Sequence, residues 1–142
     1  MSIELSELVD RAELADLVHR QGRWLDEQRW AEADTVFTAD ATVRTPGGTA
    51  AGLDALTAQA ARNHADARTQ HVTSNALIEL AGDRAVVSAN LVATFVTADS
   101  APAPSRTLGE RYRFEAVRTA AGWRFDRLEV TPIWRTEAPL AA

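Results

Sequence analysis

The apolar residues of this 142-residue chain change their spacing at Thr69. Before this point they recur every three or four residues, as they do on one face of a helix. From Thr69 onward, β-branched and aromatic residues dominate and the helical spacing is lost. Helices followed by strands predict an α+β fold, in which about three N-terminal helices cover one face of an antiparallel sheet.

The first half of the chain carries the helical signals. Asp10 with Glu13 has the spacing of a capping box, which predicts that the first helix begins there. The predicted stripe of this helix contains one amide among aliphatic residues: Leu14, Leu17, Val18, Gln21 and Leu25. Further helices are expected over 31–37 and, from Leu53, Leu56 and Ala60, over the segment that contains them.

The second half carries the signals of two β-hairpins. Gly82-Asp83 and Ala121-Gly122 are typical turn sequences between runs of strand-forming residues. Strands are expected at 40–44, 69–80, 84–97, 108–118 and 123–134. The segment 137–142 is expected to be a frayed tail.

The last strand cannot bury all its apolar residues on one face, because strand side chains alternate with a period of two. The two sets are Trp123 with Phe125, and Leu128, Val130 and Trp134. A β-bulge near Asp126-Arg127 would reconcile them and bend the sheet. The alternative is that both faces are covered.

The composition excludes several classes of function. Fifteen basic against 20 acidic residues give a formal charge of −5, which argues against a surface for nucleic acid or anionic lipid. The absence of cysteine excludes disulfides and thiolate metal sites. No segment has the apolar length of a membrane span, and the N-terminus lacks the basic start of a signal peptide. We therefore expect one cytoplasmic domain over 1–142, with its core at about 9–135.

His71 is the strongest candidate for chemistry, because imidazole exchanges protons near neutral pH. Strand alternation puts His71, Thr73 and Asn75 on one face. The other face is expected to hold Val72, Ala76, Ile78 and Leu80. Whether the face of His71 meets solvent or lines a cavity stays open at this point.

Asp26 and Gln21 are the candidates on the first helix. Asp26 is either a solvated carboxylate at a helix end or an inward-facing partner of an imidazole. Gln21 is either a structural amide or a ligand contact in a pocket wall. His19 and His64 lack the spacing of metal ligands, so no metal site is expected. Glu110 and Glu129 could each be a cavity acid or a solvated residue.

Several motifs together resemble the SnoaL-like branch of the nuclear transport factor 2-like (NTF2-like) superfamily, and scytalone dehydratase-like proteins in particular. They are Leu25-Asp26-x3-Trp30, Phe37-x2-Asp40-Ala41, Gly52, Thr69-Gln70-His71-x3-Asn75, Gly82-Asp83 and Gly122-Trp123-Arg124-Phe125. The resemblance implies a cone in which a curved antiparallel sheet wraps around the helices and encloses an apolar pocket. It also implies a homodimer.

The resemblance assigns roles to a few residues. Asp26 and His71 match a carboxylate and an imidazole that line the pocket of scytalone dehydratase-like proteins. A second histidine expected near Val96 is missing. Gln21 and Thr45 occupy the places of the key tyrosine and aspartate of ketosteroid isomerase, so that chemistry is not expected.

The functional hypothesis is therefore a cofactor-independent enzyme with Asp26 and His71 as catalytic residues. It would act on a small apolar carbonyl or hydroxyl compound by dehydration, isomerisation or cyclisation, as in secondary metabolism. Substrate contacts are expected from Gln21, Asn75, Thr73 and Tyr112. The alternative is a non-catalytic module of the same fold that binds a ligand or dimerises.

Overall fold

The computed structural model of the protein describes residues 4–136. The expected tail at 137–142 lies outside the described residues. The elements, in chain order, are α1 (Leu5–Asp26), a 3-10 helix η1 (Trp30–Thr35), β1 (Phe37–Thr45), β2 (Gly48–Ala51), α2 (Leu53–Asn63), β3 (Ala67–Ala81), β4 (Arg84–Thr97), β5 (Arg106–Thr119) and β6 (Gly122–Arg135). The α+β order and both predicted hairpins are confirmed.

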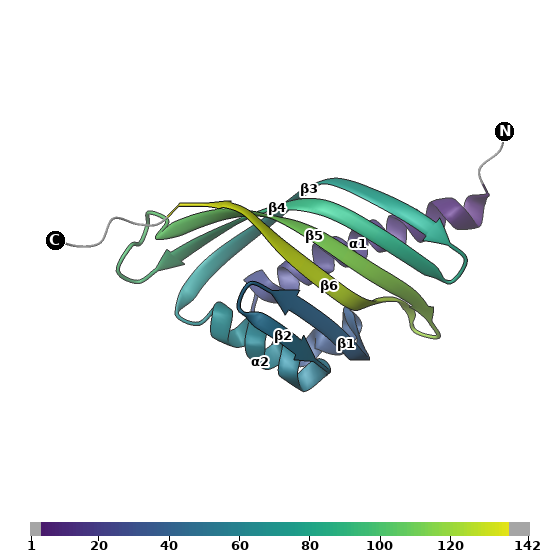
Figure 1. The fold of residues 1–142 in the computed structure, drawn as a ribbon, viewed down its shortest axis with the longest axis horizontal. Helices are drawn as coiled ribbons and strands as arrows, with labels where there is room; N and C mark the ends of the chain where they lie inside the picture. Colours follow the sequence, from purple (N-terminus) through teal and green to yellow (C-terminus); the bar gives the residue numbers. More distant parts are fainter. Residues whose placement is uncertain (1–3, 137–142) are drawn as a thin grey trace.

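One curved sheet arches over the helices (Figure 1). Its strand order is β2-β1-β6-β5-β4-β3. All neighbouring strands are antiparallel except β1 and β6, which are parallel, so the expectation of a wholly antiparallel sheet is corrected. Parallel neighbours need a long connection, and α2 with β2 to β5 provides it. Within the described residues, no helix combines the length and apolar character needed to cross a bilayer.

The helix α1 begins at Leu5, five residues before the predicted start. Asp10 does not cap the helix, because its carboxylate is hydrogen-bonded to side chains of the sheet instead. It accepts two hydrogen bonds of 2.8 Å from Arg118 and one of 3.1 Å from the indole of Trp123. The predicted stripe from Leu14 to Leu25 is buried, including Gln21, and packs in the core.

Bulges bend the sheet in β6 and in β3. In β6, Phe125 pairs with Ala116 and Arg127 with Glu115, so Asp126 is an extra residue, and of the two alternatives for this strand the bulge is confirmed. Ile133 is a further extra residue of β6, because Gly109 pairs with Trp134 and Glu110 with Pro132. Trp134 therefore leaves the face of Leu128 and Val130 and is exposed, which corrects the expectation that the three share one face. The bulge in β3 falls between Ser74 and Leu77 and was not expected. It bends the strand toward the helices.

The bulge in β3 also corrects the predicted strand faces. Asn75 has φ 55°, in the left-handed region, so the alternation of side chains shifts there. Val72 is 60% exposed, whereas Ile78 and Leu80 pack against the core. His71 and Ile78 therefore both face inward, although one is odd-numbered and the other even-numbered.

Candidate active site

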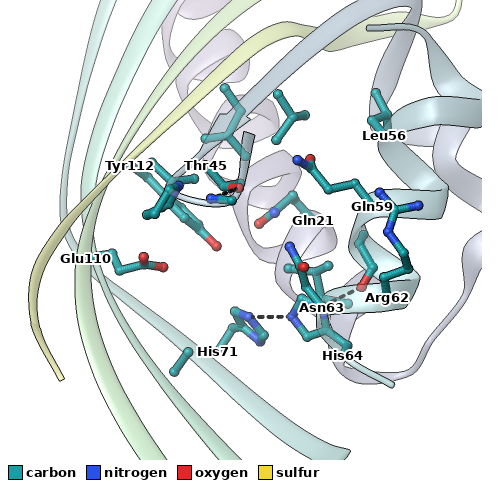
Figure 2. Close-up of a pocket in the computed structure, with 18 of the residues that line it drawn as sticks. Gln21, Thr45, Leu56, Gln59, Arg62, Asn63, His64, His71, Glu110 and Tyr112 are labelled. Atoms are coloured by element: carbon teal, nitrogen blue, oxygen red, sulfur yellow. Dashed lines mark hydrogen bonds between the residues drawn. The ribbon is translucent and has the colours of Figure 1, made fainter. Parts of the chain in front are cut away.

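A pocket lies between the concave face of the sheet and the helices α1 and α2 (Figure 2). Its volume is about 440 Å³, in the range of small-molecule sites. Aromatic and aliphatic side chains from α1, β1, β4 and β6 form much of the wall. Polar groups enter from α2, β3 and β5. The polar and charged side chains of the lining are Gln21, Thr45, Gln59, Arg62, Asn63, His64, His71, Arg106, Glu110 and Tyr112.

Asp26 and His71 form a hydrogen-bonded pair beside this pocket. Asp26 ends α1, and its Oδ1 lies 2.6 Å from His71 Nδ1. The backbone N–H of His71 donates to Oδ2 at 2.9 Å, and the hydroxyl of Thr69 donates to Oδ1 at 2.9 Å. A carboxylate at a helix C-terminus meets an unfavourable dipole, so these donors from β3 are needed to hold it there.

The pair has a defined charge distribution. Partial burial by itself would raise the pKa of Asp26, but the hydrogen bonds from His71 and Thr69 outweigh it and lower the pKa. Asp26 is therefore a carboxylate, which only accepts hydrogen bonds, and His71 Nδ1 carries a hydrogen. The imidazole side chain is only 4% exposed, so its orientation is fixed. The other ring nitrogen, Nε2, is left for the pocket.

A second imidazole meets that nitrogen. His64 Nε2 lies 3.3 Å from His71 Nε2, as the dashed line in Figure 2 marks. His64 Nδ1 lies 2.7 Å from the carbonyl oxygen of Ala60, so it carries a hydrogen and donates. Both Nδ1 atoms carry a hydrogen, so the contact depends on whether a further proton lies between the two Nε2 atoms. With one such proton, the two rings form a hydrogen bond. Without it, the lone pairs of the two Nε2 atoms face and repel each other. The pair is thus suited to holding one exchangeable proton.

The surroundings of His64 favour its neutral form. Burial lowers the pKa of His64, and the charge of Arg106 acts in the same direction. The ring stacks on Phe95, with centroids 5.5 Å apart. His71 differs in having a carboxylate partner at its Nδ1.

A second cluster of polar side chains lies in another part of the pocket. The side chains of Glu110 and Tyr112 project from β5 and lie near Gln21 (Figure 2). Burial raises the pKa of Glu110, while the charges of His71 and Arg106 oppose that shift. Burial also raises the pKa of Tyr112, so its hydroxyl stays protonated and can donate. Oxygen atoms of a ligand would meet hydrogen-bond donors here.

The structure brings together only some of the residues expected from the sequence. Gln21, His71 and Tyr112 line the pocket, and Asp26 lies behind His71. Thr73 and Asn75 do not line it. Thr73 borders a shallow groove between α1 and β3, and Asn75 is the exposed residue of the bulge.

Sequence reasoning missed the roles of His64 and Arg106. His64 continues the buried stripe of Leu56 and Ala60 at the same spacing of four, which was an available signal. Its contact with His71 depends on the packing of α2 against the sheet, which spacing cannot give. Within residues 4–136, no group of three or more side chains of the metal-binding types could hold a metal ion.

The chain was compared with known families and structures. A family model described as a SnoaL-like domain matches residues 6–129. A search of curated proteins found no significant match. Among solved structures, a protein from Kribbella flavida is 23% identical, with a TM-score of 0.83 over 92% of this chain and 95% of that one.

Two further structures share the fold. A candidate scytalone dehydratase from Novosphingobium aromaticivorans is 23% identical, with a TM-score of 0.82 over 96% of this chain and 92% of that one. A hexachlorocyclohexane dehydrochlorinase, LinA type 2, is 20% identical, with a TM-score of 0.83 over 96% and 94% of the two chains. At these identities the likeness establishes the NTF2-like fold.

The buried state of His64 predicts a loss of stability in acid. Its pKa is lowered on folding, so below the unfolded-state value near 6.5 the unfolded chain binds more protons and the free energy of unfolding falls. Replacement of His64 by Gln removes its contribution to the pH dependence of the free energy of unfolding. Denaturant unfolding of His64→Gln should therefore vary less than that of the wild type between pH 7.5 and pH 5. The exposed His19→Gln is the matched control, and an equal pH dependence in all three proteins would contradict the assignment.

Proposed function

Since the chain belongs to the SnoaL-like domain family, we propose that it is a cofactor-independent lyase that eliminates water, or a similar leaving group, from a small apolar carbonyl compound. The observation that carries this proposal is the 2.6 Å pair of Asp26 and His71, whose other imidazole nitrogen lies at the pocket, 3.3 Å from His64 Nε2. Names of structural neighbours support the reaction class, because dehydratases and dehydrochlorinases both catalyse eliminations.

In the proposed reaction, neutral His71 Nε2 takes a proton from the carbon beside the carbonyl group. Asp26 keeps the ring in the required tautomer and stabilises the imidazolium that forms. The hydroxyl of Tyr112, and the carboxyl of Glu110 when protonated, donate to the carbonyl oxygen as negative charge develops on it.

The second step expels the leaving group. The electrons of the enolate form the new C=C bond while the bond from the β-carbon to its hydroxyl breaks. The proton on His71 Nε2 moves to the departing oxygen, so water leaves and the imidazole returns to its neutral form. His64 Nε2 lies 3.3 Å away and gives the proton a second site between the two steps. The elimination is redox-neutral, so it needs no oxidant or reductant.

The dyad predicts a large loss of activity on mutation. With a panel of β-hydroxy ketones as substrates, His71→Ala should lower kcat by about 10² to 10⁴, the usual contribution of a general base. Asp26→Asn should also lower kcat, because Asn cannot stabilise the imidazolium. His19→Ala, on the exposed face of α1, is the control and should keep full activity.

Exchange of substrate protons with deuterated water, followed by NMR, tests the first step separately. Wild-type protein should catalyse exchange at the carbon beside the carbonyl, and His71→Ala should not. Unchanged turnover and exchange in His71→Ala would exclude the dyad as the catalytic group. A wild-type protein that binds the ketones without exchange or turnover would favour the alternative, a non-catalytic binding module.

We also propose a homodimer, as the family resemblance implies. A row of paired residues crosses four strands on the outward face of the sheet. It consists of Val72, Val92, Gly109 and Trp134, and the indole of Trp134 covers Gly109. Val72 and Trp134 are 60% and 46% exposed, which is unusual for apolar residues of this size. Sedimentation equilibrium should give a dimer for the wild type and a monomer for Val92→Glu. A monomeric wild type at micromolar concentration would contradict the proposal.

A further inference from the structure

The pocket contains polar atoms that lack partners. In the described part of the chain, four buried side-chain nitrogen or oxygen atoms have no hydrogen-bond partner. Three of them belong to residues that line this pocket: Gln21 Oε1, Trp24 Nε1 and Arg106 Nε. Buried polar atoms are almost always hydrogen-bonded in folded proteins, so these three call for water or a polar ligand in the cavity.

Of these three residues, Arg106 has the greatest free-energy cost when a buried polar atom lacks a hydrogen-bond partner, because its side chain carries a charge. It projects inward from β5 beside its neighbour Phe95 on β4, and its guanidinium lies 4.1 Å from the centre of that ring. Many arginines of the chain pair with a carboxylate; examples are Arg84 with Asp126 and Arg118 with Asp10. Within residues 4–136, Arg106 has no such pair, although it is half-buried.

In the described residues, no acid of the pocket forms an ion pair with Arg106. Asp26 is engaged by His71 and Thr69. Glu110 projects from the same face of β5, four residues further along, and the charge of Arg106 acts on its pKa, but the two side chains form no ion pair. Burial raises the pKa of Glu110, which weakens it further as a partner. The other charged or titratable side chains that line the pocket add no negative charge: they are His64, His71, the exposed Arg62 and Tyr112, whose raised pKa keeps it neutral.

We propose that Arg106 binds a carboxylate of the substrate, so that among small carbonyl compounds the pocket favours those that also carry a carboxylate. The inference extends the proposed function, since it names the substrate class of the same site. A guanidinium donates two parallel hydrogen bonds to a carboxylate, and such charge-assisted pairs are strong where water is excluded. Arg62, at the C-terminal end of α2, adds a second positive charge at the rim.

This arrangement orients the substrate. Phe95, which carries the guanidinium on its face, also lies 6.2 Å from the ring of His71. A carboxylate on Arg106 therefore brings the rest of the substrate to the side of the pocket that holds His71. Glu110 and Tyr112 follow on the same face of β5 and are available to its carbonyl oxygen.

Equilibrium binding tests the proposal independently of turnover. The probes are aromatic and alicyclic carboxylates (benzoate, phenylacetate and cyclohexanecarboxylate) with their neutral amides, titrated into the 142-residue protein by NMR at pH 7.5. One charge-assisted pair predicts that the best acid binds about 10- to 100-fold more tightly than its amide. Arg106→Gln should abolish this preference, and Arg106→Lys should keep part of it.

The control is Arg111→Gln, which removes the same charge from an exposed position of the same strand and should leave the preference intact. His71→Ala should also keep it, so a failed catalytic mechanism would not affect this result. Thermal unfolding checks that each variant is folded. Equal binding of acids and amides, no binding of any acid, or a preference that survives Arg106→Gln would overturn the proposal. Tighter binding of phenylphosphonate than of every carboxylate would overturn the assignment to a carboxylate.

Discussion

The carboxylate of Asp26 joins the end of α1 to the first half of β3, and the candidate site depends on this junction. One side chain accepts hydrogen bonds from the backbone N–H of His71, from its ring and from the hydroxyl of Thr69. These contacts fix where the helix ends against the strand, which tautomer the imidazole adopts and which nitrogen faces the pocket. The same interaction therefore serves the packing of α1 on the sheet and the proposed proton transfer.

The curvature of the sheet creates the concave face on which the pocket lies, next to the contact between Asp26 and β3. The bulges at Asn75 and Asp126 bend β3 and β6 without breaking the sheet, and each shifts the alternation of side chains by one residue. In β3 the shift lets His71 point into the cavity while Ile78 packs in the core. In a strand without a bulge, His71 and Ile78 would lie on opposite faces of the sheet. Both the pocket and the hydrophobic core therefore depend on the bulge.

Much of this architecture is visible in the sequence. The change of spacing at Thr69 predicted the α+β order. The alternation of Trp123 and Leu128 left a bulge near Asp126 as one of two alternatives, and the structure contains that bulge. The bulge at Asn75 was missed, because the apolar residues around it fit one uninterrupted strand face. The contacts of His64 and Arg106 were missed for another reason. They form between elements far apart in the chain, and spacing within one element says nothing about what faces it.

The central claim is that Asp26 holds a hydrogen on Nδ1 of His71 and leaves Nε2 to the pocket. Long-range ¹H–¹⁵N NMR of histidine-labelled protein reads this directly, with the signals assigned from the three single histidine variants. The account predicts a protonated Nδ1 on His71 at every pH at which the protein is folded, and the loss of this preference in Asp26→Asn. A neutral His71 ring with its hydrogen on Nε2 in the wild-type protein would contradict it.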